Sequence, residues 1–128
     1  MQDEVKKLIL DGSCCAQVQV QMALALRGEK NDQLVQAVGG LCGGARSGLT
    51  CGAFTGACCA LTMFDPALAK DEMIPALLDW FEQKWGSASC SDILDGDPLR
   101  KTTLCPTIMA ETWEKTRSLL EEYGYDFG

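Results

Sequence analysis

Apolar residues recur at helical spacing along almost the whole of this 128-residue chain, and no stretch shows the sustained alternation that a half-buried strand needs. A chain of this length is expected to form one domain, and it buries enough surface for a core without help from disulfides. The pattern therefore predicts a single all-α domain over residues 1–128, a bundle of about five to six helices with a glycine-rich loop.

The expected helices begin at capping residues and end at glycine or at a turn. They are a short helix up to Gly12, one from Ser13 to Gly28, one from Asn31 or Asp32 to Gly39, one capped by Thr50 that runs from Cys51 to about Phe64, one from about Asp71 to Trp85, a short turn at Ser89–Leu94, a polar turn at 95–98 and a last helix after Pro106. Residues 39–48 read GGLCGGARSG. Five glycines in these ten residues predict a loop.

Charge and hydropathy argue against several classes of partner. The formal net charge is −7 and the eleven basic residues are scattered, which argues against binding to nucleic acid. The longest weakly polar stretch, Leu49–Phe64, is shorter than the roughly 20 apolar residues that span a bilayer. Met1–Leu10 is charged and lacks the apolar stretch of a signal peptide, so a cytoplasmic location is expected. In that reducing compartment, cysteines tend to be reduced, catalytic or metal-bound.

The chain contains eight cysteines and no histidine. Without an imidazole, the Ser-His-Asp and Cys-His nucleophile systems are excluded, as are Cys/His zinc sites and iron sites that need histidine. Thiol–disulfide chemistry, an all-thiolate metal or iron–sulfur site, and cysteines that merely pack a core are the possibilities that remain.

Four of the cysteines share one context, the expected start of a helix. These are Cys15 after Ser13, Cys51 after Thr50, Cys90 after Ser89, and Cys105 before Pro106, a residue typical of a first turn. Backbone N–H groups and the positive end of the helix dipole stabilise an anion at such a position. A thiol there is pushed towards thiolate, which is the nucleophile in disulfide exchange and the ligand of soft metals.

The other four cysteines are weaker candidates. Cys58 and Cys59 lie in the middle of an expected helix among alanines, so we expect them to be packing residues. Cys14 is about 100° around the helix from Cys15, so the two cannot both face one site. Cys42 lies in the glycine loop and is either an auxiliary or resolving thiol that reaches Cys51 or an exposed bystander.

No CxxC spacing occurs, so any joint site must be assembled by the tertiary fold. If the four cysteines at helix starts serve one site, Cys51 and at least one of the other three should lie within disulfide reach. We expect this site beside Gly52 and Gly56, with Cys58 and Cys59 elsewhere.

Residues 51–56 read CGAFTG, a CGAxxG motif, with Cys15 upstream and Cys90 and Cys105 downstream. In this order the cysteines resemble those of the C_GCAxxG_C_C family of redox-active proteins, and the resemblance covers the chain from about Gly12 to Leu120. Cys15 takes the upstream position because Ala16-Gln17 follow it, as the family pattern expects. The resemblance implies a small helical cytoplasmic protein that is labelled redox-active for its cysteines, and it brings no settled reaction with it.

The leading hypothesis is a cysteine-based redox protein that works by thiol–disulfide exchange or electron transfer with a redox partner protein. Its site residues would be Cys51 as the reactive thiolate, Cys15, Cys90 and Cys105 as resolving partners, and Cys42 as an auxiliary thiol. One alternative is an all-thiolate metal or iron–sulfur module, and another is a helical interaction protein with structural cysteines. The residues do not decide whether the protein is an enzyme, and they identify no cofactor or oligomeric state.

Overall fold

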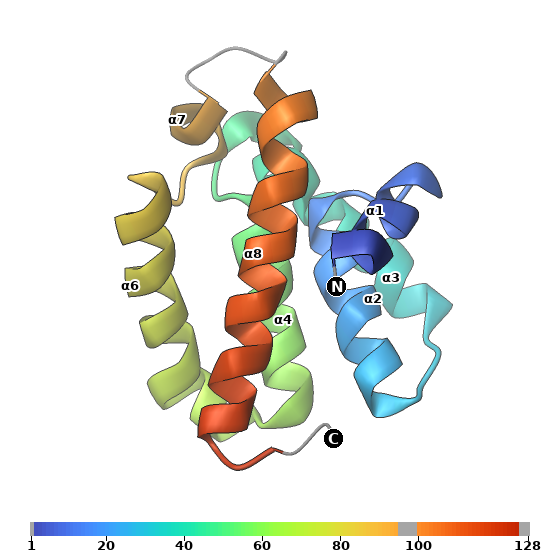
Figure 1. Cartoon of the computed structure of the whole chain (residues 1–128), viewed down its shortest axis with the longest axis vertical. Helices are drawn as coiled ribbons and strands as arrows, with labels where there is room; N and C mark the ends of the chain where they lie inside the picture. Colours follow the sequence, from blue (N-terminus) through green and yellow to red (C-terminus); the bar gives the residue numbers. More distant parts are fainter. Residues whose placement is uncertain (1, 95–99, 126–128) are drawn as a thin grey trace.

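The structure of the chain, a computed structural model, describes residues 2–94 and 100–125. In order, its helices are α1 (Gln2–Leu10), α2 (Cys15–Arg27), α3 (Asp32–Val38), α4 (Gly52–Phe64), α5 (Pro66–Leu68), α6 (Ile74–Trp85), α7 (Cys90–Leu94) and α8 (Arg100–Glu122), with a short 3-10 turn at Gly39–Leu41 (Figure 1). Extended pairing in this part of the chain is limited to an isolated bridge between Thr50 and Ser89. The all-α prediction is confirmed, with slightly more helical segments than expected.

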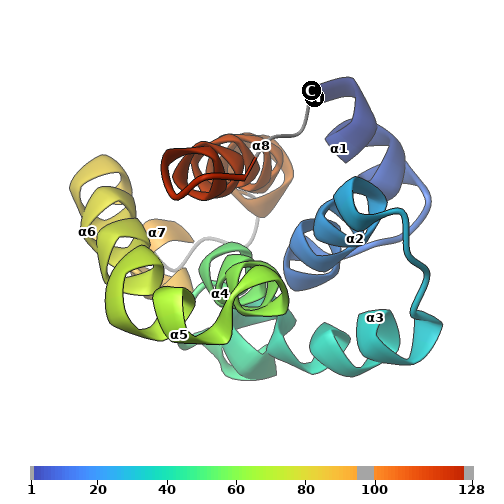
Figure 2. The same cartoon turned by 90° about the horizontal axis from the view of Figure 1, so that it is seen from below.

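Helix α4 is the central element of the bundle, with α2, α5, α6 and α8 packed around it (Figure 2). Its composition allows this position, because most of its buried residues are small and let neighbouring backbones approach. The core beside it contains Trp113 of α8 and Phe81 of α6, which are 1% and 0% exposed. The ring centroids of Phe54 and Phe81 are 5.7 Å apart, so α4 and α6 meet through an aromatic contact.

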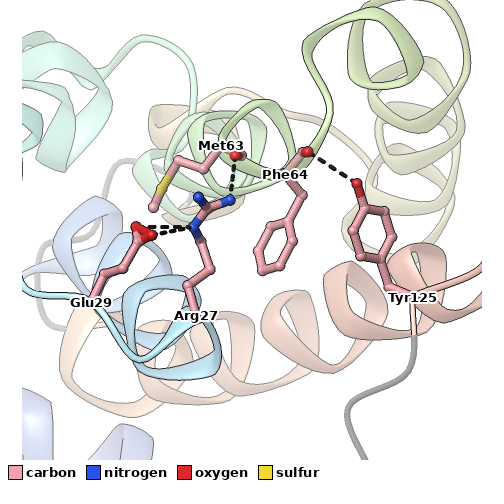
Figure 3. Close-up of polar contacts among 5 residues, drawn as sticks. All are labelled: Arg27, Glu29, Met63, Phe64 and Tyr125. Carbon is pink, nitrogen blue, oxygen red and sulfur yellow. Dashed lines mark hydrogen bonds and ion pairs between the residues drawn. The ribbon is translucent and has the colours of Figure 1, made fainter.

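Side chains from two other segments cap the C-terminal end of α4 (Figure 3). Arg27 at the end of α2 donates from Nη1 to the carbonyl oxygen of Met63 at 2.7 Å, and it also pairs with Glu29. The hydroxyl of Tyr125 donates to the carbonyl oxygen of Phe64 at 3.0 Å. The last carbonyls of a helix have no partner within the helix, so these contacts satisfy two of them and tie α4 to both neighbours.

The Tyr125→Phe variant is expected to lose about 1 kcal/mol of unfolding free energy, because it removes the hydrogen bond to Phe64 and keeps the ring contact. Urea unfolding curves would measure the difference. Tyr123→Phe is the matched control, since Tyr123 is 38% exposed and should tolerate the same change. Equal losses in both variants would contradict a capping role for the Tyr125 hydroxyl.

The structure shifts two expected caps by one residue. Cys14, and not Ser13, is the N-cap of α2, and Cys51, and not Thr50, is the N-cap of α4. The third cap is confirmed, because the Asn31 side chain accepts a hydrogen bond from the N–H of Leu34 at 3.1 Å. Cys15 therefore begins α2, and Cys51 immediately precedes α4.

The helix expected from about Asp71 begins earlier, at Pro66. Asp65 caps it by accepting from the N–H of Leu68 at 3.1 Å, so Asp65 and Pro66 form a start signal that the sequence reading missed. A π-helical turn at Ala69–Met73 then leads into α6. Pro75 follows this turn and has no N–H to donate to the preceding turn of helix. The wider π-helical turn makes room for its ring.

Helix α8 begins at Arg100, six residues before the proline that was expected to precede it closely. Pro106 lies inside the helix, so the expectation that Cys105 stands at a helix N-terminus is wrong. Tertiary packing overrides the local cost of the proline, because Ile108, Met109 and Trp113 of the same helix are all buried. The polar turn expected at 95–98 lies outside the described residues. Among the residues that are described, no helix is long and apolar enough to cross a membrane.

Candidate functional site

One small cavity brings together the four cysteines that the sequence singles out. It has a volume of about 20 Å³ and is lined by Cys15, Cys51, Cys90 and Cys105 together with Gly43, Gly52, Ala53, Ile108 and Met109. A space of this size holds about one water molecule, so the lining side chains are near neighbours. The four cysteines belong to different elements, and the tertiary fold alone assembles them.

The two glycines of the CGAxxG motif allow Cys15 to reach the cavity. A Cβ on Gly56 would stand 2.7 Å from the Cα and carbonyl oxygen of Ala16, so α2 and α4 cross in close backbone contact there. One turn earlier, a Cβ on Gly52 would overlap the sulfur of Cys15. Each glycine therefore leaves room for a neighbouring residue of α2, and the motif has a direct packing explanation.

The isolated antiparallel bridge between Thr50 and Ser89 positions Cys51 and Cys90. Their N–H groups donate across the bridge in two hydrogen bonds of 2.6 and 2.5 Å. In an antiparallel pair these two residues are diagonal neighbours on one face, roughly 7–8 Å apart. The bridge thus sets the starts of α4 and α7 side by side at the cavity.

Helix α8 supplies the remaining wall. Cys105, Ile108 and Met109 are spaced at i, i+3 and i+4, so they lie on one face of the helix, and all three line the cavity. The side chain of Gln19 in α2, which is 0% exposed, donates to the carbonyl oxygen of Met109 at 2.8 Å. This buried hydrogen bond joins α2 to α8. It therefore limits sliding of the two helices along each other, and with it any change in the position of Cys105 relative to Cys15.

Burial raises the pKa of the Cys51 thiol from an ordinary value of 9.0 to about 12. The sulfurs of Cys15 and Cys90 act in the same direction and the backbone amides of Ala53 and Phe54 at the start of α4 act against it, and the value of about 12 is the net result of all these effects. Burial is the largest of these effects, and Cys51 is only 6% exposed. Cys51 is therefore protonated at neutral pH in this conformation, and desolvation outweighs the expected activation by the helix end.

Cys42 does not join the cavity. A disulfide links it to Cys14, with the two Cα atoms 6.1 Å apart. The alternative in which Cys42 reaches Cys51 as an auxiliary or resolving thiol is therefore wrong for this structure. It is also 1% exposed, which removes the alternative of an exposed bystander. Cys14 and Cys15 do face different sites, as their helical positions require. Cysteine spacing carried no signal for the Cys14–Cys42 pair.

Cys58 and Cys59 lie at a separate, shallow hollow in the C-terminal half of α4, which Leu34, Thr62 and Met63 also line. Burial raises the pKa of Cys58 to about 12 and also raises the pKa of Cys59. Among the described residues, no group of three or more cysteines and carboxylates is arranged so that it could hold a metal ion. The four cavity cysteines are thus neighbours without forming a closed set of metal ligands.

A family model described as "Putative redox-active protein (C_GCAxxG_C_C)" matches residues 13–119. The chain belongs to this family. The C_GCAxxG_C_C pattern names four cysteines, and in this chain Cys15, Cys51, Cys90 and Cys105 occur in that order and line one cavity. No curated protein and no solved structure matches the chain.

The name of the C_GCAxxG_C_C family writes the central motif as GCAxxG, whereas this chain has Cys51 before Gly52. In this order the cysteine is the N-cap of α4 and the glycine is the first helical residue. Because Gly52 has no side chain, it leaves space for the sulfur of Cys15, while Cys51 lines the cavity.

Proposed function

We propose that this protein is a thiol–disulfide redox protein whose reactive centre is the four-cysteine cavity, formed by Cys15, Cys51, Cys90 and Cys105. The observation that supports this most is the convergence of these four residues, from separate elements, on one cavity of about 20 Å³. The Cys58 and Cys59 pair lies elsewhere, so the clustering is selective.

Exposure suggests how the work is divided within the cavity. Cys15, Cys90 and Cys105 are half-buried, whereas Cys51 is buried. A partner protein can reach a half-buried sulfur first, so one of these three makes the initial attack. Cys51 then acts as the resolving thiol, which reverses the roles expected from the sequence.

The reaction consumes a disulfide of a partner protein. A half-buried cavity thiolate attacks one partner sulfur, which breaks the partner disulfide and forms a mixed disulfide. Cys51 then attacks the cavity sulfur of this mixed disulfide, and its proton goes to the departing partner thiolate. The cavity gains one disulfide and loses two electrons, and the partner leaves as a dithiol after gaining two electrons and two protons. Run in reverse, the same steps oxidise a partner dithiol.

Oxidised glutathione, added without oxygen to protein whose Cys14–Cys42 bond is intact, tests this reaction. We expect one new disulfide between Cys51 and one of the other cavity cysteines, with two glutathione thiols released per chain. Peptide mapping by mass spectrometry identifies the bond. In Cys51→Ser, the reaction should stop at a mixed disulfide between glutathione and a half-buried cavity cysteine.

Cys58→Ser is the matched control, because it removes a half-buried thiol of α4 that lies outside the cavity and should leave the reaction unchanged. Glutathione spread evenly over cavity and non-cavity cysteines, or first oxidation at Cys58 or Cys59, would contradict the proposal. Stoichiometric zinc or iron in protein purified without oxygen, lost in Cys51→Ser, would instead favour an all-thiolate metal site.

A further inference from the structure

The Cys14–Cys42 disulfide lies next to the four-cysteine cavity without lining it. Each of its cysteines is followed in the chain by a residue that does line the cavity, Cys15 after Cys14 and Gly43 after Cys42. The Cα of Cys42 also lies 3.2 Å from the position that a Cβ would take on Gly52. The disulfide therefore holds the glycine-rich segment against the cavity at the start of α2.

The segment that follows this disulfide has an unfavourable backbone. Gly43 and Gly44 both have φ 64°, and Ala45 and Arg46 continue in the same left-handed region at 58° and 59°. This region suits glycine and disfavours residues that carry a Cβ. Such a turn persists where its ends are held, so releasing one end favours a different conformation.

The other end of the segment is held by hydrogen bonds. The hydroxyl of Ser91 in α7 donates to the carbonyl oxygen of Gly48 at 2.7 Å, and the N–H of Cys90 donates to that of Leu49 at 2.5 Å. Within the segment, the N–H of Leu49 donates to the carbonyl oxygen of Gly44 at 3.0 Å. A covalent bond at Cys42 and surface hydrogen bonds at residues 48–49 thus anchor a strained middle.

The chain before the segment has its own attachment to α2. Gln17 accepts a hydrogen bond from the N–H of Cys14 at 3.1 Å and donates to the carbonyl oxygen of Val35 at 3.0 Å. The bond from Gln17 to Val35 holds α3 against α2 whether or not the disulfide is present. Breaking the disulfide would therefore release the chain from Cys42 onwards and leave α3 in place.

We propose that the Cys14–Cys42 disulfide is a redox-controlled clasp, whose reduction releases residues 42–48 from α2 and opens the four-cysteine cavity at Cys51. A dithiol reductant supplies the two electrons: the bond between the two sulfurs breaks, each sulfur gains a proton, and the dithiol becomes a disulfide. The use made of the opened cavity rests on the proposed function, whereas the opening itself does not.

Opening the clasp changes the chemistry of Cys51 in a known direction. Burial is the largest cause of its raised pKa, so water that enters the cavity lowers this pKa. Each unit of decrease raises the thiolate fraction about tenfold, and the thiolate is the form that reacts. The clasp thus couples the redox state of one cysteine pair to the reactivity of another cysteine.

The alkylation rate of Cys51 by iodoacetamide, read by mass spectrometry of its peptide, tests the clasp. We compare wild type with the clasp oxidised, wild type with the clasp reduced by a phosphine, and Cys42→Ser. The second and third should react at least about tenfold faster than the first. Hydrogen exchange at the amide of Leu49 should accelerate with them, while the amides of α6 keep their protection.

Cys59→Ser is the control, since it removes a cysteine of α4 that lies outside both the clasp and the cavity. Equal alkylation rates in all three forms would overturn the clasp, even if glutathione still oxidises the cavity. Faster alkylation without any cavity disulfide would leave the clasp standing and defeat the proposed function. If α6 loses protection from hydrogen exchange in Cys42→Ser, the measurement on reduced wild type decides whether the clasp opens locally. Loss of α6 protection in reduced wild type as well would mean that the Cys14–Cys42 disulfide supports the whole fold, and it would overturn the clasp.

Discussion

The protein should lose stability steeply above pH 9, because Cys51 and Cys58 are held as neutral thiols in the folded state. Burial raises both pKa values from 9.0 to about 12, so the unfolded chain ionises first as the pH rises. The stabilisation is complete below about pH 9 and is lost progressively between pH 9 and 12. Each thiol removes about 1.4 kcal/mol per pH unit within that window.

Urea unfolding without oxygen at about pH 8, 9.5 and 10.5 would measure how the unfolding free energy falls with pH. These values span the onset of the predicted loss. The double variant Cys51→Ala/Cys58→Ala should show a much shallower decline, because lysine and tyrosine titration is common to both proteins. Comparison of the slopes avoids the separate cost of the cavities that the substitutions create. Equal slopes would mean that both Cys51 and Cys58 ionise near their ordinary pKa in the folded protein, which would contradict their burial.

Replacing Gly56 by alanine should destabilise the protein by about 2 kcal/mol, although alanine is normally the better helix residue by about 1 kcal/mol. The added Cβ would stand 2.7 Å from backbone atoms of Ala16, which cannot rotate away as a side chain could. Helix α2 must then move off α4, and Cys15 moves with it. We therefore expect both a lower unfolding free energy and less oxidation of the cavity by glutathione.

Gly40→Ala is the matched control, since a Cβ on Gly40 meets nothing within 4 Å and its φ lies outside the left-handed region. This variant should unfold within about 0.5 kcal/mol of wild type and oxidise normally. An increase in stability at Gly56, as helix propensity alone would give, would show that the two helices do not cross as closely as described.

The fold class could be predicted from sequence because helical periodicity reflects which face of each helix is buried. Boundaries at prolines could not, since a proline is compatible with either a helix start or a tolerated interior position. Pro106 stands inside α8 because the packing of this helix against α2 and α4, with Ile108, Met109 and Trp113 buried, offsets its local cost. Only the tertiary contacts of that helix carry this information.

The membership of the cavity was predictable in part. Cysteine order and the CGAxxG motif selected the four cysteines that line it, and the glycines of the motif prove to be the contact points with α2. The ionisation state of Cys51 was not predictable, because burial depends on how α7 and α8 close over it. The partner of Cys42 was also missed, since its flexible segment could reach several sulfurs and the backbone path alone selects Cys14.

The short span of the Cys14–Cys42 bond bears on how the protein is made. Its cysteines are 28 positions apart, whereas Cys105 follows Cys15 by 90 positions. A chain emerges from the ribosome N-terminus first, and shorter loops close at lower entropic cost. Cys14 and Cys42 can therefore meet while Cys90 and Cys105 are still untranslated. A disulfide oxidant that pairs them at this stage takes up the two electrons and two protons and withdraws two of the eight sulfurs before the cavity is assembled, so its four thiols have fewer partners with which to mispair during biosynthesis.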